Sequence, residues 1–240
     1  MFGYYFDPTY ILVVIGALLC IFASSRVNST YSKYAKVRSR SGITGAEAAQ
    51  RILQMSGIYD VKIQHVAGNL TDHYDPSQKV LRLSDSVYGS NSVAAIGVAA
   101  HECGHALQHK EGYVPLKIRS ALVPAANIGS KLGIPIVILG LILGIGFPLP
   151  GGGYFSLAEI GIWVFALAVL FQVMTLPVEF NASGRALKML GNYGLMSTDE
   201  VKDCRRVLGA AALTYVAAAA SSILQLLRLI LLSGNRRRRD

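Results

Sequence analysis

The sequence is short of charged residues and of cysteines. Charged residues make up 15% of the chain and hydrophobic residues 52%, whereas a typical soluble protein is about 25% charged. This composition excludes a disordered chain, a coiled coil and an ordinary cytosolic globule. The three cysteines, Cys20, Cys103 and Cys204, cannot all pair with one another. Their wide spacing matches neither a disulfide framework nor a cysteine-based zinc finger.

Lysine and arginine are absent from residues 1–25 and from residues 132–184. Of the 23 basic residues, thirteen lie between these stretches and ten follow the second one. The two stretches contain three apolar segments that are long enough to cross about 30 Å of hydrocarbon as helices. No basic residue precedes the first segment, which favours a retained anchor over a cleaved signal peptide. The three predicted spans cover about residues 8–25, 132–149 and 160–178.

The placement of the basic residues predicts the topology. With three crossings, residues 26–131 and 179–240 lie on one side, which the positive-inside rule assigns to the cytoplasm. The N-terminus and the turn Pro148–Gly153 then face away from the cytoplasm. Residues 207–233 are apolar enough for a fourth span, but that crossing would place Arg236–Arg239 outside. We therefore expect the C-terminal part to form a cytoplasmic or membrane-surface helix pair.

The segment between the first two spans mixes helical and strand patterns. A capping box at Thr44–Glu47 marks a helix start, and alternating apolar and polar residues mark two strands with a turn at Tyr74–Ser77 between them. The expected elements are a helix over about 45–56, a short β-ribbon formed by Val61–Val66 and Val80–Leu83, and a helix from Ser92 to about Gln108.

The last of these helices carries an H-E-x-x-H motif. His101 and His105 lie four residues apart, so on a helix their imidazoles share one face and can bind one zinc ion. Glu102 lies beside that face, where it can accept a proton from a zinc-activated water. These residues predict a catalytic zinc site with Glu102 as the general base.

A catalytic zinc ion takes three protein ligands and one water, so a third ligand is needed. His109 continues the i+4 series, but on a straight helix it lies about 12 Å beyond His101 and on a different face. The metzincin pattern also fails, because Gln108 and Glu111 occupy the positions that it requires to be Gly and His. Among the downstream carboxylates, Glu179 stands where the third span ends on the cytoplasmic side. We therefore expect Glu179 to be the third ligand.

Together these residues resemble a known family. The H-E-x-x-H helix after a β-ribbon and the sequence E-F-x-A-S beginning at Glu179 are similar to the YugP-type neutral zinc metallopeptidases. These are bacterial membrane proteins related to the HtpX and Ste24 gluzincins. Residues 70–76 and 191–195 also resemble that family, so the likeness covers almost the whole chain. In the HtpX-like pattern an Asp four residues after the ligand Glu supports a zinc histidine, but here this position is Ser183.

The resemblance implies a fold and a division of the chain. It implies a mainly α membrane protein with three transmembrane helices and a cytoplasmic α+β zincin-like catalytic domain, built from the active-site helix and the short β-ribbon. The expected boundaries are a transmembrane anchor over 1–25, a catalytic region over 26–131, a transmembrane hairpin over 132–178, and a cytoplasmic helical region over 179–240 that carries the third zinc ligand.

The resemblance also implies a bacterial inner-membrane endopeptidase with a cytoplasmic active site. Zn²⁺ held by His101, His105 and Glu179 would polarise the scissile carbonyl of a membrane-associated or misfolded polypeptide. His73, Tyr74 and Arg185 are the candidates for stabilising the oxyanion. We expect the substrate to bind as an added strand along Val80–Leu83.

Two further considerations bear on function. The alternative to a protease is a non-proteolytic zinc-binding membrane scaffold, which the intact Glu102 disfavours because a structural zinc site needs no general base. The net charge of +9 could suggest nucleic acid. No basic and aromatic module accompanies Arg236–Arg239, however, and we assign this run to contact with anionic lipid of the bilayer.

Overall fold

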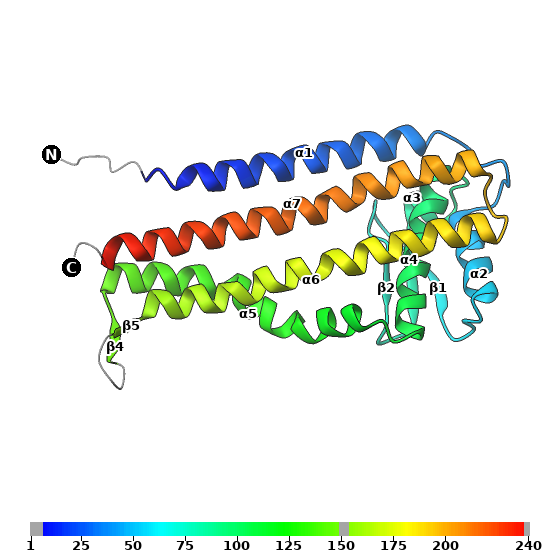
Figure 1. Ribbon diagram of the computed structural model, residues 1–240. Coiled ribbons are helices and arrows are strands. Elements are labelled where there is room, and N and C mark those ends of the chain that lie inside the picture. Colours follow the sequence, from blue (N-terminus) through cyan, green and yellow to red (C-terminus); the bar gives the residue numbers. More distant parts are fainter. Residues whose placement is uncertain (1–6, 149–153, 238–240) are drawn as a thin grey trace. The chain divides into compact units, whose positions relative to one another are not determined.

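A computed structural model describes residues 7–148 and 154–237 of the 240-residue chain. The protein is mainly helical, with two small sheets (Figure 1). The elements in chain order are α1 (Tyr10–Tyr34), α2 (Gly45–Met55), β1 (Lys62–Val66), β2 (His73–Asp75), β3 (Val80–Ser84), α3 (Asp85–Tyr88), α4 (Val93–Lys110), α5 (Val114–Leu143), β4 (Gly146–Pro148), β5 (Tyr154–Ser156), α6 (Leu157–Asn192) and α7 (Thr198–Arg237).

The chain folds into two compact units. One unit comprises Ala23–Lys117 and Leu176–Thr214, and we call it the mixed unit because it contains helices and a three-stranded sheet. The other unit contains the remaining described residues and consists mainly of long apolar helices, so we call it the helical unit. Helices α1, α5, α6 and α7 each contribute residues to both units.

The mixed unit contains a three-stranded sheet in the order β1–β3–β2. Strand β3 pairs with β1 in parallel and with β2 antiparallel. The expected two-stranded ribbon is therefore wrong in two respects, because its strands are parallel and a third strand lies beside them. Strand β3 is the central strand, and the backbone of Val80–Arg82 has partners on both sides, so it is not an edge that a peptide can extend. That expectation is also wrong.

Helix α4 lies in the core of the mixed unit. Ser92 caps its start, with Oγ accepting a hydrogen bond from the Ala95 backbone N–H at 3.1 Å. Side chains of α4, α2, β3, α6 and α7 pack together in one apolar cluster. The expected capping box of α2 is present, since Thr44 and Glu47 satisfy each other's backbone N–H groups. Burial of α4 on several sides holds the motif residues in a fixed orientation.

In the helical unit α5 and α6 pack backbone against backbone. A Cβ atom added at Gly129 would lie 2.5 Å from the Val164 carbonyl oxygen, and one at Gly140 would lie 2.2 Å from the Ala158 nitrogen. Gly161 of α6 approaches Val137 in the same way. Small residues allow such close approach between helices in an apolar environment. Strands β4 and β5 connect the two helices and pair antiparallel; residues 149–153 of the expected turn lie outside the described residues.

Helix α7 is one continuous helix that packs along α1 in the helical unit. The Arg228 guanidinium lies 3.2 Å from the Asp7 carboxylate and 4.1 Å from the centre of the Tyr10 ring. Further along, a Cβ atom added at Gly16 would lie 2.7 Å from Ser221 Oγ. The described residues thus contain four helices that are long and apolar enough to cross a membrane, rather than three. Helix α7 is a candidate for a fourth crossing because no proline interrupts it and its apolar residues continue beyond 207. The expected surface helix pair stays a prediction.

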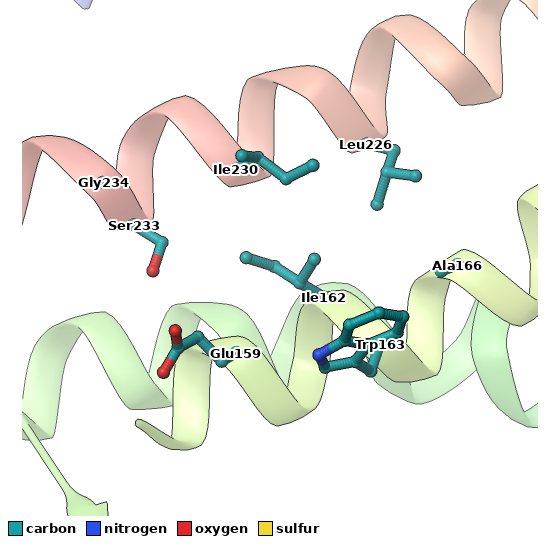
Figure 2. Close-up of a pocket in the computed structure, with 8 residues that line it drawn as sticks. All are labelled: Glu159, Ile162, Trp163, Ala166, Leu226, Ile230, Ser233 and Gly234. Atoms are coloured by element: carbon teal, nitrogen blue, oxygen red, sulfur yellow. The ribbon is translucent and has the colours of Figure 1, made fainter. Parts of the chain in front are cut away.

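A cavity of about 330 Å³ lies between α6 and α7 in the helical unit. Figure 2 shows Ile162 and Trp163 of α6 facing Leu226 and Ile230 of α7 across it. Glu159 brings a carboxylate to its wall, and that carboxylate also accepts hydrogen bonds from Ser156 at the start of α6. Ser233 adds a hydroxyl group, and most of the other lining side chains are apolar.

Candidate metal centre

Two helices of the mixed unit bring the three predicted ligands together. His101 and His105 lie one turn apart on α4, with ring centres 4.8 Å apart and ring planes nearly perpendicular. Glu179 of α6 places Oε2 3.2 Å from His101 Nε2 and 3.6 Å from His105 Nε2. The three potential ligand atoms all lie within 4.8 Å of one another. Two imidazoles and one carboxylate are the donor set of many catalytic zinc sites.

Gly104, between the two histidines, allows α6 to approach α4. A Cβ atom added there would lie 2.5 Å from the Ala182 carbonyl oxygen, which is closer than real Cβ atoms come to any neighbour. The two backbones are therefore in direct contact at this point. The short carboxylate side chain of Glu179 can reach both histidines because the helices are this close.

Both histidines use their Nδ1 atoms for hydrogen bonds within the protein. His101 Nδ1 lies 3.1 Å from Ser183 Oγ, and His105 Nδ1 lies 3.0 Å from Gln108 Oε1. The orientation of the Gln108 amide is determined by its NH₂ group, which donates to the Val178 carbonyl oxygen. Its oxygen must therefore accept from His105, which makes Nδ1 the protonated nitrogen and leaves the Nε2 lone pair facing Glu179.

This arrangement leaves two acceptors facing each other. An unprotonated His105 Nε2 and the Glu179 carboxylate both offer lone pairs, so a cation between them would satisfy both. Burial lowers the pKa of His105, but the contact with Glu179 and the charge of Glu102 outweigh burial and raise it. A metal ion would supply the cation that the two acceptors need, because metal ligands bind in their deprotonated forms. The residues present therefore fit zinc.

A chain of polar contacts extends from His105 to α6. Gln108 is fully buried, and its NH₂ group also donates to Asn181 Oδ1 at 3.0 Å. The same Asn181 oxygen accepts a hydrogen bond from Arg185 Nε at 2.7 Å. Arg185 in turn forms an ion pair with Glu111, just after α4, at 2.7 Å. These contacts connect the C-terminal end of α4 to α6 and hold the His105 ring in place.

Glu102 lies next to the first histidine and is buried, with 8% of its surface exposed. Within the described part of the chain its side chain makes no hydrogen bond or ion pair, unlike that of Glu179. A carboxylate without a competing partner can accept a proton from a nearby water.

The other predicted site residues lie around the metal-ligand cluster rather than in it. Tyr74 and His73 are on β2, the strand at one edge of the sheet. The Tyr74 hydroxyl lies 2.9 Å from His109 Nδ1, one turn beyond His105 on α4. His73 contacts the Thr71 carbonyl oxygen and the Arg82 guanidinium. His109 is not in the cluster, as its position on the helix predicts.

Burial raises the pKa of Tyr74, and the nearby carboxylates of Asp60 and Asp75 raise it further. Its hydroxyl therefore keeps its proton at neutral pH and can act as a hydrogen-bond donor.

Sequence reasoning missed the roles of Gln108 and Asn181. Gln108 is three residues after His105, and residues at i and i+3 are neighbours on a helix surface. This spacing in a largely apolar helix could have indicated the contact. Asn181 gave no such signal, because its partner Gln108 lies on another helix.

Comparison with known proteins identifies the class of protein. The family described as "Putative neutral zinc metallopeptidase" matches residues 9–234, and the chain therefore belongs to this family of zinc metallopeptidases. It is 45% identical over 229 residues to the "Putative membrane protease YugP" of Bacillus subtilis (strain 168), covering 95% of this chain and 98% of that protein. No solved structure matches the chain. The chain is thus a membrane metalloprotease by family, and its cofactor is Zn²⁺.

Proposed function

We propose that this protein is an endopeptidase in which His101, His105 and Glu179 hold the zinc ion. The observation that carries this proposal is the convergence of three ligand atoms from α4 and α6 within 4.8 Å of one another. The Nδ1 contacts support it, because histidine ligands of metals generally donate their second ring N–H to a neighbouring acceptor. Three protein ligands would leave a fourth position open for water, as catalysis requires and a structural site does not.

The catalytic step needs a proton acceptor and a proton donor. A bound zinc ion supplies Lewis-acid chemistry and lowers the pKa of water. We assign Glu102 to accept a proton from the attacking water and to pass it to the leaving amine. Its burial, and the absence of any hydrogen bond or ion pair to it within the described residues, support this assignment.

We assign Gln108 and Ser183 to position the two histidines. Ser183 occupies the place of the Asp expected from the HtpX-like pattern and contacts His101. Gln108 contacts His105 in the same way. Its own NH₂ group donates hydrogen bonds to the Val178 carbonyl oxygen and to Asn181 Oδ1. Both groups are neutral, so the charge of the ligand set comes from Glu179 alone. A neutral support leaves the histidines weaker electron donors than a carboxylate would.

The oxyanion requires a hydrogen-bond donor or a cation, and His73, Tyr74 and Arg185 remain our candidates. Tyr74 has the best support, since its raised pKa keeps the hydroxyl protonated and it contacts α4 through His109. Arg185 already contacts Asn181 and Glu111. We therefore assign Arg185 a second role, which is to hold the end of α4 in place.

We place the polypeptide substrate along β2 instead of β3. An extended peptide adds to a strand whose outer edge is unpaired, and β2 is an edge strand whereas β3 is central. The contact between Tyr74 and His109 brings β2 close to the end of the motif helix. A cavity of about 430 Å³ beside this contact, lined in part by Lys79 and Lys110, offers room for a substrate side chain.

We propose that the mixed unit is the catalytic part and faces the cytoplasm. Of the 23 basic residues, thirteen lie between 26 and 131, five between 185 and 206, one at Arg228 and four in the C-terminal run. If α7 is a fourth crossing, this distribution still assigns the mixed unit to the positive, cytoplasmic side. The run Arg236–Arg239 would then lie on the same side as the N-terminus.

Zinc content measured together with proteolysis tests the proposal. The purified full chain should contain about one zinc ion and cleave an unfolded protein such as casein, and a chelator should abolish the cleavage. The matched variant is Glu102→Gln, whose amide cannot accept a proton. It should keep the zinc and lose about 10²–10⁴-fold in rate. A zinc-loaded wild type that cleaves no faster than Glu102→Gln would favour the zinc-binding scaffold instead.

A further inference from the structure

A cationic cleft lies between α1 and α7 in the mixed unit, in a part of the fold that the peptidase site does not use. Its volume is about 640 Å³, and Arg26 and Lys33 of α1 and Arg206 of α7 line it. The hydroxyl side chains of Ser29 and Thr30 also reach it. No carboxylate side chain is among the residues that line the cleft.

The helical repeat explains why these side chains gather at one place. Residues 26, 29, 30 and 33 recur at the spacing that puts them on one face of α1. On α7 the facing positions include Gly209 and Ala210, whose small side chains leave the space open. A Cβ atom added at Gly209 would meet nothing within 4 Å. The cleft is therefore built from a cationic face opposite a face of small residues.

Among the described residues, Arg206 is the one cation of the three that has an acidic partner. Arg206 donates to the Asp203 carboxylate at 2.7 Å and to the Tyr34 hydroxyl at 3.2 Å. Lys33 Nζ lies 5.3 Å from the centre of the Tyr34 ring. Neither Lys33 nor Arg26 forms an ion pair with any carboxylate in the described part of the chain. Two positive charges in the cleft are thus uncompensated, which favours an anionic ligand.

The place of the cleft along the two helices indicates the source of that anion. Arg26 is the first charged residue after the uncharged segment 8–25, and residues 207–227 of α7 carry no charge after Arg206. The apolar segments of both helices therefore end at the cleft, and Leu213 lines its apolar side. Basic residues next to the cytoplasmic end of a transmembrane helix are the usual partners of anionic lipid headgroups.

We propose that this cleft binds the phosphate headgroup of an anionic glycerophospholipid, with Arg26 and Lys33 as the main cationic contacts. The Thr30 hydroxyl lines the cleft and can donate a hydrogen bond to a phosphate oxygen. The Ser29 hydroxyl donates to the Arg26 carbonyl oxygen at 3.1 Å and offers the cleft its oxygen lone pairs instead. This site is distinct from the C-terminal run of arginines, and it does not depend on the peptidase mechanism.

The test is lipid binding by the delipidated full chain in neutral detergent, counted by native mass spectrometry. The three probes are phosphatidylglycerol, the zwitterionic phosphatidylcholine and inorganic phosphate. Arg26→Gln combined with Lys33→Gln removes both uncompensated charges. Arg51→Gln combined with Lys62→Gln is the control, because it removes two exposed charges outside the cleft.

We expect wild type and control to retain phosphatidylglycerol and the cleft variant to bind it about 30-fold more weakly, at roughly fivefold per charge. Gly209→Leu, which fills the cleft without removing charge, should weaken binding in the same direction. Equal binding by the cleft and control variants would overturn the proposal, and so would equal retention of phosphatidylcholine. If millimolar inorganic phosphate displaced phosphatidylglycerol, the ligand of the cleft would be free phosphate rather than a lipid headgroup.

Discussion

Helix α6 packs closely against α5 in the helical unit and against α4 in the mixed unit, and both contacts depend on a glycine. A Cβ atom at Gly129 of α5 would lie 2.5 Å from the Val164 carbonyl oxygen. One at Gly104 of α4 would lie 2.5 Å from that of Ala182. In each case the absence of a side chain lets two helix backbones touch.

The side chains beside these two contacts differ completely. Near the α5 contact they are apolar, such as Phe165 and Val137. Beside the α4 contact, Glu179 and Ser183 of α6 face the two motif histidines. The same packing device thus produces an anchor in one unit and a metal-ligand cluster in the other. Close approach sets the distance between the helices, and the polarity of the neighbouring residues decides what can bind there.

The largest effect should come from removing the polar residue that distinguishes the α4 contact. Glu179→Ala should lose most of its zinc and its activity, because two histidines alone leave the ion under-coordinated and open to a mild chelator. His109→Ala should keep both, since His109 lies outside the ligand cluster. Elemental analysis of protein that is folded in detergent measures the zinc.

The opposite pattern would contradict the ligand assignment. Zinc lost in His109→Ala and retained in Glu179→Ala would mean that α6 contributes no ligand. The contact of α6 with α4 would then serve packing alone, as its contact with α5 does.

The next largest effect concerns the glycines themselves. Gly104→Ala and Gly133→Ala should each destabilise the protein by about 1–3 kcal/mol, because the new methyl group meets backbone or Cβ atoms of α6. Only Gly104→Ala should also reduce zinc affinity, since it alone separates Glu179 from the histidines. Thermal unfolding in detergent and zinc titration measure the two effects.

Gly191→Ala is the control for these substitutions. Gly191 lies within α6, and a Cβ atom added there meets nothing within 4 Å. The substitution should therefore leave the free energy of unfolding unchanged or raise it slightly. Unchanged zinc affinity in Gly104→Ala would show that the close approach is not needed for the site.

A smaller effect should follow from the loss of the His105 support. Gln108→Ala should weaken zinc binding by about 10–100-fold, which is the usual cost of removing a hydrogen-bond partner of a metal ligand. Gln54→Ala, an exposed change on α2, is the control. A competitive zinc indicator measures both affinities. If Gln108→Ala and Gln54→Ala bound zinc equally well, Gln108 would contribute to packing only. The polar network would then not distinguish the α4 contact from the α5 contact.

The smallest effect concerns Asp75, which lies on β2 in the mixed unit. Hydrogen bonds from the Ser77 side chain, the Gln78 backbone N–H and the Arg82 side chain lower the pKa of Asp75 from its ordinary value of 3.8 to about 2. Because this folded-state pKa is depressed, the ionised carboxylate stabilises the fold above about pH 4, and this contribution is lost as the pH falls through about 2.

Asp75→Asn should therefore lower the stability of the mixed unit at pH 7, and the difference from wild type should shrink between pH 4 and pH 2. Denaturant unfolding at a series of pH values measures this difference in stability. A difference that persists undiminished at pH 2 would mean that the substitution acts through packing rather than charge. No such pH dependence is expected from a substitution at the apolar α5 contact.

The sequence alone predicted the features that depend on residues close together in the chain. Apolar length and the absence of lysine and arginine indicated three of the four long apolar helices. The i+4 spacing indicated that His101 and His105 share a face of α4. The capping box at Thr44 marked the start of α2 correctly. Each of these depends on local geometry, because one turn of helix determines which neighbours a side chain can reach.

Tertiary structure decided which distant residues meet. The sequence pattern of β3 did not reveal that β1 pairs with it in parallel and β2 covers its other side, so the edge strand was misassigned. The packing of α7 along α1, with Arg228 beside Asp7 and Tyr10, was likewise not indicated by the sequence pattern. The contact of Gln108 with Asn181 requires α4 and α6 to touch at Gly104. These pairings join residues far apart in the chain, and their partners are selected by the shape and polarity of the assembled surfaces rather than by any local repeat.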